Sequence, residues 1–380
     1  MHQGMASSPS CSPSHPPLHV ATTTTLKGPG PALLPWLAHH HAMQFRTSLL
    51  FWDDPDDPDQ SLLSHAPCAE CVVSVRVDAA VRDEWRALPS YAVLSDHLDV
   101  VDSRQRLNAE LAMRRAAALD VQWLLHLDAD ESLHSPFASV IDVLRDALPA
   151  AACDDGSCDA AADADGLDAA VGQLVLLNRE AVPEQPEHED WLSSVTLFRC
   201  HPFEIRSLDQ PSQQKAAALR RKSSSSQLRS PTGGYLLYDN GKSLVRVGAA
   251  EASADVHAFR LLPHAVVGTD GGGGSSGGGA EYATRVQRNL SAACVHHFPT
   301  TSFSSWRAKY AKGQAGGRTQ GSFPFYSASF DVAAKGDEQA RQFYRAVVLP
   351  HPREVEEHLA IGSWLRVTPQ AQRGGVDAPF

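Results

Sequence analysis

Strand-like and helix-like patterns alternate along the first part of the chain, and this alternation is the strongest constraint on the fold. Runs of β-branched or apolar residues, typical of buried strands, occupy residues 18–25, 47–52, 71–77 and 123–127. Apolar residues at helical spacing occupy residues 32–43, 103–119 and 137–148. Strands that alternate with helices form mainly parallel sheets covered on both faces. We therefore expect an α/β fold with a mainly parallel, mixed sheet flanked by helices.

The second half of the chain contains more strand-like segments, which are separated by polar inserts. Extended segments are expected at residues 173–178, 194–198, 235–238, 243–247 and 293–298, and helices at about 302–312 and 338–348. Low-complexity inserts occupy about residues 150–170, 211–229 and 271–279. These inserts lack the apolar residues that packing requires, so we expect them to be mobile surface loops.

The same patterns predict one large domain between two terminal segments. Residues 1–17 are rich in Ser, Pro and His, and we expect them to be disordered. They contain no positively charged region followed by an apolar stretch, so no secretory signal peptide is visible. Residues 18–350 are expected to form the domain, and residues 351–380 a C-terminal tail.

Charge and hydropathy exclude several classes of protein. The chain has 33 Lys and Arg residues against 44 Asp and Glu residues, which gives a formal net charge of −11. It therefore lacks the positive field that attracts nucleic acid. Because no long apolar run occurs, no transmembrane segment is expected. The 380 residues, 43% hydrophobic and 20% charged, suit an enzyme with a well-developed core.

The most informative short motif follows the apolar run at residues 123–127. This run leads directly into Asp128-Ala129-Asp130, which places two carboxylates at the carboxyl edge of a sheet, where open α/β sheets bind ligands. Two carboxylates one residue apart suit Mn²⁺ or Mg²⁺, with further coordination positions left for diphosphate oxygens and water. The alternative is a solvated acidic turn that caps the next helix.

The segment at residues 123–131 resembles the W-L-x-x-h-D-x-D-E signature of GT-A-fold glycosyltransferases, most of all the family-92 (formerly domain-of-unknown-function 23) and family-2-like group. Segments similar to other elements of this group follow in the expected order, at residues 36–40, 50–55, 105–108, 178–184, 196–199, 241–246, 256–257, 295–298 and 306–310. The resemblance implies a GT-A-like domain, a nucleotide-sugar donor, a glycan acceptor and a Mn²⁺ or Mg²⁺ cofactor. It also implies a Golgi location, although no signal anchor is visible in this sequence.

The resemblance implies a metal site built from two aspartates and one histidine. Asp128 and Asp130 would bind the divalent ion that holds the nucleotide sugar. His257 would complete the coordination, and His296 is the rival for this role. For either histidine, the alternative is a partly buried side chain with a structural hydrogen bond.

Four more residues are expected to contact the donor or the acceptor. Asp53 and Asp54 lie where the group contacts the nucleotide base or ribose, although Asp and Pro also favour a solvated turn. Lys242 and Arg246 are expected to contact phosphate or acceptor, and their alternative is an exposed strand edge.

An inverting transfer needs a carboxylate that deprotonates the acceptor hydroxyl. The candidates are Asp190, Glu180 and Glu189. Glu189-Asp190-Trp191 resembles the acidic base motif of inverting family-2 enzymes, so Asp190 is the preferred base, whereas Glu180 lies in the better-matched segment. A surface or structural carboxylate is the alternative for each.

The expected activity is the metal-dependent transfer of a hexose, with galactose as the expected sugar, from a nucleotide diphosphate sugar to a glycan. The alternative from another class is a catalytically silent relative that binds a nucleotide sugar or a glycan. A metal-dependent phosphohydrolase would also use paired aspartates. The residues after Asp128 lack the Asp-x-Asp-Gly-Thr pattern of the aspartyl-phosphate class, which disfavours that reading.

Overall fold

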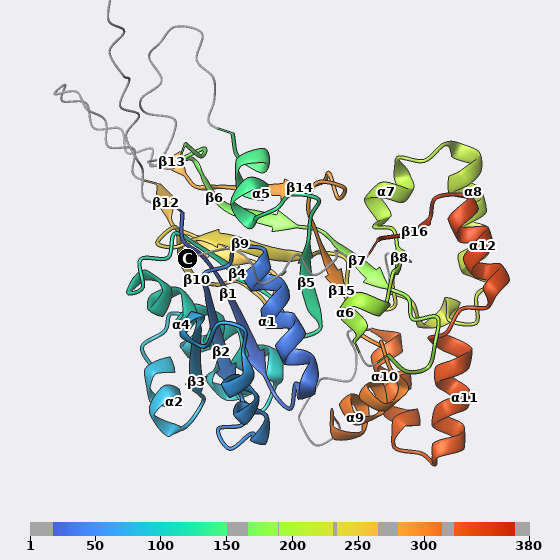
Figure 1. Ribbon diagram of the computed structural model, residues 1–380, viewed down its shortest axis with the longest axis horizontal. Coiled ribbons are helices and arrows are strands. Elements are labelled where there is room, and N and C mark those ends of the chain that lie inside the picture. Colours follow the sequence, from blue (N-terminus) through green and yellow to red (C-terminus); the bar gives the residue numbers. More distant parts are fainter. Residues whose placement is uncertain are drawn as a thin grey trace, which may run out of the picture.

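The computed structural model describes residues 18–149, 166–188, 190–230, 234–264, 280–313 and 323–368. Two large β-sheets, two short strand pairs and the surrounding helices make up this part of the chain (Figure 1). The expected α/β class is therefore confirmed. Residues 1–17, most of the insert at 150–170 and the insert at 271–279 lie outside the described residues.

The larger sheet has seven strands within the described residues, and it is mixed. From one edge to the other, the strands are β3 (Val72–Arg76), β2 (Thr47–Trp52), β1 (Val20–Leu26), β4 (Trp123–His126), β9 (Lys242–Arg246), β6 (Val171–Leu176) and β14 (Ala283–Gln287). The first four are mutually parallel. β9 runs antiparallel to both of its neighbours, and β6 pairs with β14 in parallel. The sheet is therefore mainly parallel, as expected.

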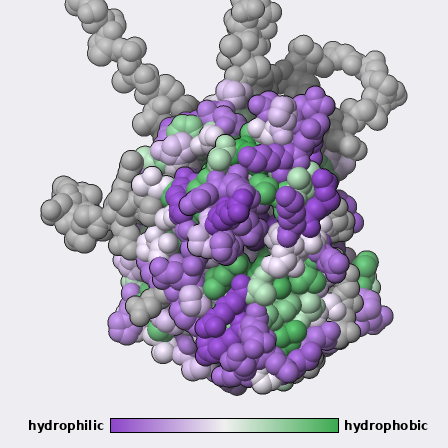
Figure 2. Space-filling model, turned by 90° about the vertical axis from the view of Figure 1, so that its right-hand side faces the viewer, coloured by the Kyte–Doolittle hydropathy of each residue, from purple (hydrophilic) through white to green (hydrophobic). Residues whose placement is uncertain are grey.

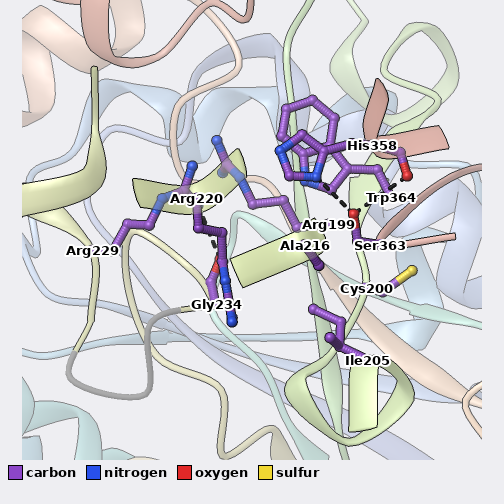
Figure 3. Close-up of a pocket in the computed structure, with 10 residues that line it drawn as sticks. All are labelled: Arg199, Cys200, Ile205, Ala216, Arg220, Arg229, Gly234, His358, Ser363 and Trp364. Atoms are coloured by element: carbon purple, nitrogen blue, oxygen red, sulfur yellow. Dashed lines mark hydrogen bonds between the residues drawn. The ribbon is translucent and has the colours of Figure 1, made fainter. Parts of the chain in front are cut away.

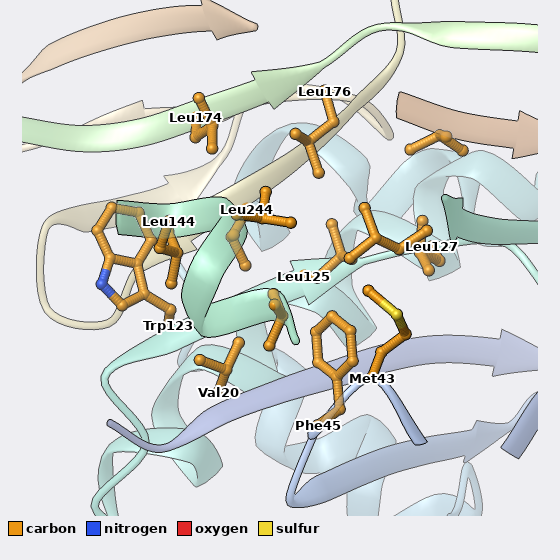
Figure 4. Close-up of a cluster of buried hydrophobic side chains, with 14 of the residues drawn as sticks. Val20, Met43, Phe45, Trp123, Leu125, Leu127, Leu144, Leu174, Leu176 and Leu244 are labelled. Carbon is orange, nitrogen blue, oxygen red and sulfur yellow. The ribbon is translucent and has the colours of Figure 1, made fainter. Parts of the chain in front are cut away.

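Alternating side chains of these strands fill two separate hydrophobic cores. One core contains Val20, Trp123, Leu125 and Leu244, packed beneath α1 (Leu33–Ala42) and α5 (Val140–Ala147) (Figure 4). The other core contains the intervening residues of the same strands, including Ala21, Leu124 and Val245, packed beneath α2 (Ala79–Trp85) and α4 (Val101–Ala117). The period of two residues along a strand explains this division, because successive side chains point to opposite faces. The central strands of the larger sheet are therefore buried on both faces.

The second sheet continues from the first at the Asp-x-Asp segment. Its strands, in spatial order, are β16 (Trp364–Arg366), β8 (Leu197–Arg199), β7 (Asn178–Ala181), β15 (Cys294–His297) and β5 (Glu131–His134). β5 begins one residue after Asp130, so the turn between β4 and β5 connects the two sheets. Two short hairpin-like pairs complete the strands: β10 (Ala250–Ser253) with β11 (Phe259–Leu261), and β12 (Pro263–His264) with β13 (Ala280–Glu281).

The remaining helices lie around the second sheet or beside α4. They are α3 (Tyr91–Leu94), α6 (Trp191–Ser194), α7 (Pro202–Arg206), α8 (Gln210–Lys222), α9 (Phe303–Gly313), α10 (Pro324–Ala333), α11 (Asp337–Val347) and α12 (Pro352–Ala360). Helices α9, α10 and α11 share an aromatic core that includes Trp306 and Tyr310. Figure 2 shows the side of the molecule on which α8 and α12 lie: it is mostly hydrophilic, with a hydrophobic area in its lower half.

Three expectations about the second half of the chain are wrong. Residues 211–229 were expected to form a loop, but most of them belong to α8, which Asp209 caps by accepting a hydrogen bond from the Ser212 N–H at 2.7 Å. The expected tail at 351–380 contains α12 and β16, and β16 pairs with β8 as an edge strand of the second sheet. The domain therefore extends beyond residue 350.

The third wrong expectation is a strand at residues 235–238. These residues form an irregular buried segment, because the Leu236 and Leu237 N–H groups donate to the Glu180 carboxylate at 3.0–3.1 Å instead of to a neighbouring strand. The Tyr235 hydroxyl donates to the Asn178 carbonyl at 2.7 Å. The apolar run therefore reflects burial and not sheet pairing.

Candidate functional site

The Asp-x-Asp segment lies at the point where the order of the parallel strands reverses. β1 is followed in the chain by β2 on one side and, later, by β4 on its other side. Open α/β sheets bind ligands outside the carboxyl ends of the strands at such a switch point. Asp128 follows the carboxyl end of β4 by two residues. Topology alone therefore makes this turn the first candidate for a ligand site.

Asp128 is held by side chains from two other elements. Its Oδ2 accepts a hydrogen bond from Lys242 Nζ at 2.8 Å, and its Oδ1 accepts one from Gln105 Nε2 at 2.7 Å. Lys242 begins β9, which is antiparallel to β4, so its buried ammonium reaches the carboxyl end of β4. Burial alone would raise the pKa of Asp128, but the charges of Lys242 and His126 hold that pKa well below its usual value. The carboxylate is therefore ionised and keeps 24% of its side-chain surface exposed.

Asp130 has a lysine partner of its own. Its Oδ2 accepts a hydrogen bond from Lys309 Nζ at 2.7 Å, and the two side chains are 30% and 29% exposed. Lys309 lies on α9, whose neighbouring Trp306 and Tyr310 are buried in the aromatic core. Burial raises the pKa of Asp130 while Lys309 and His297 lower it, and the net direction is downward. Both aspartates of the motif are therefore ionised and paired with a lysine.

Glu131 is the buried member of the acidic group. Its Oε2 accepts the Asp128 N–H at 2.7 Å and lies 3.5 Å from Lys242 Nζ. Burial raises the pKa of Glu131 well above its usual value, and the Asp128 charge adds to this rise. Burial lowers the pKa of Lys242, but Asp128 and Glu131 raise it, and the net direction is upward. Lys242 is therefore charged, whereas burial disfavours the ionised form of Glu131.

His257 is oriented toward the Asp128 region. Its Nδ1 donates to the Gly241 carbonyl at 2.8 Å, so in the neutral ring Nε2 carries the lone pair. Burial and the charge of Lys242 lower the pKa of His257 to about 4. The ring is thus neutral at pH 7 and presents the nitrogen that a metal or a polar ligand requires.

His296, the rival histidine, is directed elsewhere. Its ring stacks on His134 and Phe198, with centroids 4.1 and 4.0 Å away. The next residue along β15, His297, points to the opposite face, as neighbouring strand residues do. Its ring stacks on Tyr238 at 4.6 Å, and its pKa, lowered by burial, responds to the charge of Asp130. His297 is therefore the histidine of this pair that belongs to the site.

Four buried polar atoms around the site have no hydrogen-bond partner among the described residues. They are Glu131 Oε1, His126 Nε2, His297 Nδ1 and the Tyr238 hydroxyl. The Tyr238 ring joins the group, because it contacts the His257 ring at 4.5 Å and lies 5.5 Å from Lys242 Nζ. Native proteins leave few buried polar atoms unpaired, so these four atoms are positions where water, an ion or a ligand can bind.

The donor atoms at the site suit a divalent cation in their chemistry, but they do not converge. Asp128, Asp130 and His257 offer two carboxylates and an imidazole nitrogen, which suit Mn²⁺. The described residues contain one group of three ligand atoms within 4.8 Å of one another, and it is His41 with Cys68 and Cys71. These two cysteines form a disulfide, so they are not available as thiolates. A cation that used Asp128 Oδ1, Asp128 Oδ2 or Asp130 Oδ2 would have to displace the Gln105 or lysine hydrogen bond that each already accepts.

Asp53 and Asp54 play different parts at the end of β2. Asp53 is buried and forms a bidentate pair with Arg104 of α4, with distances of 2.6 and 2.8 Å. Asp54 is exposed, and its Oδ1 accepts the Asp56 N–H at 3.1 Å. Asp53 therefore attaches α4 to the sheet beside Gln105, and Asp54 is part of a solvated turn. Their contact with a nucleotide stays a prediction.

Arg246 lies at the far end of β9 from the site. Lys242 and Arg246 are four residues apart, which is roughly 13 Å along a strand. The Arg246 guanidinium donates to the carbonyls of Val171 and Asp168 and lies 4.7 Å above the Trp123 ring. The structure therefore gives Arg246 a structural role at the edge of β6, whereas Lys242 lies at the site.

The two described candidates for the base differ in accessibility. Glu180 is fully buried, pairs with Arg199 at 2.5 Å and accepts the Leu236 and Leu237 N–H groups, so it does not fit the role of a base that meets an acceptor. Asp190 is half-buried and caps α6, with Oδ2 accepting the Ser193 hydroxyl at 2.6 Å. Glu189 lies outside the described residues.

A chain of contacts connects the segment around Asp190 with the aspartate motif. The ring of Trp191, the next residue, lies 4.4 Å from that of Phe298. The Phe298 N–H in turn donates to the Asp130 carbonyl at 2.8 Å. Asp190 therefore remains a candidate base.

Sequence reasoning missed several residues of the site. Gln105, Lys309, His297 and Tyr238 come from α4, α9, β15 and the irregular segment before β9. Gln105, Lys309 and His297 lay within segments similar to the glycosyltransferase group, whereas Tyr238 lay outside them. A polar residue inside a matched segment was therefore the available signal for three of these four residues.

No helix among the described residues is both long enough and apolar enough to cross a membrane. The chain matches no protein-family model, and no curated protein is a significant match to it.

Proposed function

We propose that this chain is a glycosyltransferase that moves a hexose, with galactose the first sugar to test, from a nucleotide diphosphate sugar to a glycan, with Mn²⁺ or Mg²⁺ as cofactor. The observation that carries the proposal is the Asp128–Asp130 pair at the strand switch point, surrounded by charged and unpartnered polar groups. The strand order and the resemblance of residues 123–131 to the GT-A signature support the same reading.

The charges at the site favour a ligand pair that carries both positive and negative charge. Asp128 and Asp130 are balanced by Lys242 and Lys309, and burial disfavours the ionised form of Glu131. A divalent cation alone would add uncompensated positive charge, and a diphosphate alone would add negative charge. A cation and a diphosphate that bind together preserve the balance, and the lysines then become available to the phosphate oxygens. We therefore expect the metal and the nucleotide to bind cooperatively.

The proposed reaction assigns a separate role to each residue of the site. Asp128, Asp130 and His257 would hold the cation, which when bound would neutralise charge on the departing diphosphate. Lys242 would fix the orientation of Asp128 and supply a buried positive charge beside the phosphates. Asp190 would accept the proton of the acceptor hydroxyl. Replacement of Asp190 by Asn should lower kcat by about 100-fold or more, with donor binding retained.

The first test measures the thermal unfolding midpoint with UDP-galactose or UDP, with Mn²⁺, and with both together. A ligand that binds only the folded state raises this midpoint. We expect a larger rise with both ligands than the sum of the two separate rises, and we expect Asp130→Asn to abolish the excess. The exposed Asp96→Asn is the matched control, because it removes one acidic charge away from the site. No rise with any nucleotide would refute the proposal.

The lysine pairs also favour a second candidate, a protein that binds a nucleotide sugar or glycan without turnover. Lys242 and Lys309 already neutralise the two aspartates, so a diphosphate could bind to these lysines without a metal ion. In that case UDP would raise the midpoint equally with Mn²⁺ and with EDTA, and no sugar would be released from the donor. Metal-dependent release of galactose to a glycan or to water would exclude this candidate.

A further inference from the structure

A second cluster of positive charge surrounds a small cavity at the other end of the second sheet. The cavity lies between β8, α7, α8 and the C-terminal α12 and β16, and its polar lining includes Arg199, Arg220, Arg229 and His358 (Figure 3). Its volume is about 10 Å³, which is room for about one water molecule. No residue of the lining is acidic.

The two innermost guanidinium groups are buried, and one of them has no acidic partner. Arg199 is paired with Glu180 at 2.5 Å. Arg229 donates to the Gly234 carbonyl at 3.0 Å and to the Ser223 hydroxyl at 3.4 Å, and among the described residues no carboxylate forms an ion pair with it. A buried charge that lacks a counter-charge costs several kcal/mol in proteins. Glu180 acts on the charge of Arg229 but forms its ion pair with Arg199.

Each of these guanidinium groups also has an unused donor. The Nε atoms of Arg199 and Arg229 are buried and have no hydrogen-bond partner among the described residues, and both side chains are less than a tenth exposed. Burial, followed by the charge of Arg199, lowers the pKa of Arg229 to about 9. Two buried donors and an uncompensated charge beside one cavity form a site for a negative ligand.

The geometry points to one monatomic anion, chloride in ordinary buffers, bound in this cavity between Arg199 and Arg229. The size of the cavity selects the ligand, because an ion comparable to a water molecule fits and a tetrahedral phosphate or sulfate requires the walls to move. His358 and Trp364, whose rings stack at 4.3 Å, also line the cavity, and the Arg199 guanidinium lies 5.5 Å from the Trp364 ring. This site is separate from the Asp128–Asp130 site, and the inference does not depend on the proposed function.

The test compares thermal unfolding in NaCl and in sodium gluconate at equal ionic strength. For the wild-type protein we expect a saturable rise in the midpoint with chloride, of about 2 °C at tenfold excess over Kd, and no such rise with gluconate. Arg229→Gln should abolish the difference between the salts. The control Arg221→Gln, which removes an exposed arginine from the last turn of α8, should retain it. Retention of the chloride effect in Arg229→Gln would overturn the proposal.

A second measurement does not depend on any variant. Crystals of the wild-type protein grown in bromide should show an anomalous peak between the Arg199 and Arg229 guanidinium groups. Absence of bromide there, at concentrations that saturate the thermal effect, would overturn the proposal. A saturable stabilisation by sulfate or phosphate that chloride does not reproduce, and that Arg229→Gln removes, would also overturn it, because the ligand would then be an oxyanion.

Discussion

Lys242 is the residue on which the candidate active site depends most. Its ammonium is fully buried and lies 2.8 Å from Asp128 and 3.5 Å from Glu131. Burial lowers the pKa of Lys242, but these two carboxylates raise it and so keep the buried ammonium charged. The same three residues therefore determine both local stability and the charge that a ligand would meet.

Lys242→Met should destabilise the protein by about 3 kcal/mol, because it leaves Asp128 without its counter-charge in a partly buried position. Urea unfolding of the variant measures this loss. The double variant Lys242→Met/Asp128→Asn should recover part of it, since both charges are then absent. A loss below about 1 kcal/mol, with no coupling to Asp128, would show that the pair contributes little.

Gly241 allows β9 to begin beside β6. Its φ is +73°, and a Cβ at this position would lie 2.2 Å from the Leu176 carbonyl oxygen. The following residue is Lys242, and His257 Nδ1 donates to the Gly241 carbonyl. The start of β9 therefore determines the positions of two residues of the site.

Gly241→Ala should destabilise the protein by at least about 3 kcal/mol, because it combines an unfavourable φ with a collision against backbone. Gly248 is a matched control, since its φ is +87° and a Cβ there would meet nothing within 4 Å. Gly248→Ala should cost only about 1–2 kcal/mol. Chemical denaturation of both variants provides the comparison, and equal losses would mean that the close approach to Leu176 is not limiting.

The elements that sequence reasoning predicted correctly are those whose own side chains are buried. β2 (Thr47–Trp52) is buried along its whole length, so its apolar run marks both ends correctly. α8 was missed because Ala216 is its only buried residue among those described, and its helical form comes from the Asp209 cap and the proline in its first turn. β16 was missed because three residues become a strand only through pairing with β8.

The candidate site was predictable to the extent that it lies within one segment. Asp128 and Asp130 follow a recognisable strand, so the motif and its location at a sheet edge followed from the sequence. Lys242 and Lys309 lie 114 and 179 residues away from their aspartates. Contacts across such separations arise from the order of the strands and the packing of α9, which local patterns do not specify.

Acid should destabilise the molecule well above the pH at which its carboxylates titrate. Eleven of the described histidines have a lowered pKa, and burial is the first cause for each. The pKa is lowered to about 4 for His134 and His257 and to about 3 for His126 and His358. Burial therefore disfavours the protonated form of these rings throughout the fold.

The free energy of unfolding should fall as the pH decreases from about 6.5 to about 4. In this range the unfolded chain binds protons that the folded histidines do not, so stability rises with pH, by about 1.4 kcal/mol per pH unit for each such proton. Glu131, whose pKa is raised, acts in the opposite direction but is a single group. Urea unfolding across this range measures the slope. His126→Asn should make it shallower, and the exposed His41→Asn should leave it unchanged; a flat profile would contradict the prediction.

The two sheets are built from strands that alternate along the chain. β4, β6, β9 and β14 belong to the first sheet, whereas β5, β7, β8 and β15 belong to the second. A chain divided between β12 and β13 would leave β5 and β7 in the first fragment without β15, the strand that joins them. The second fragment would carry β14, β15 and β16 without their partner strands β6, β7 and β8. The second sheet would therefore be completed only when the two fragments reassemble, which makes this position suited to a split reporter whose signal depends on that sheet.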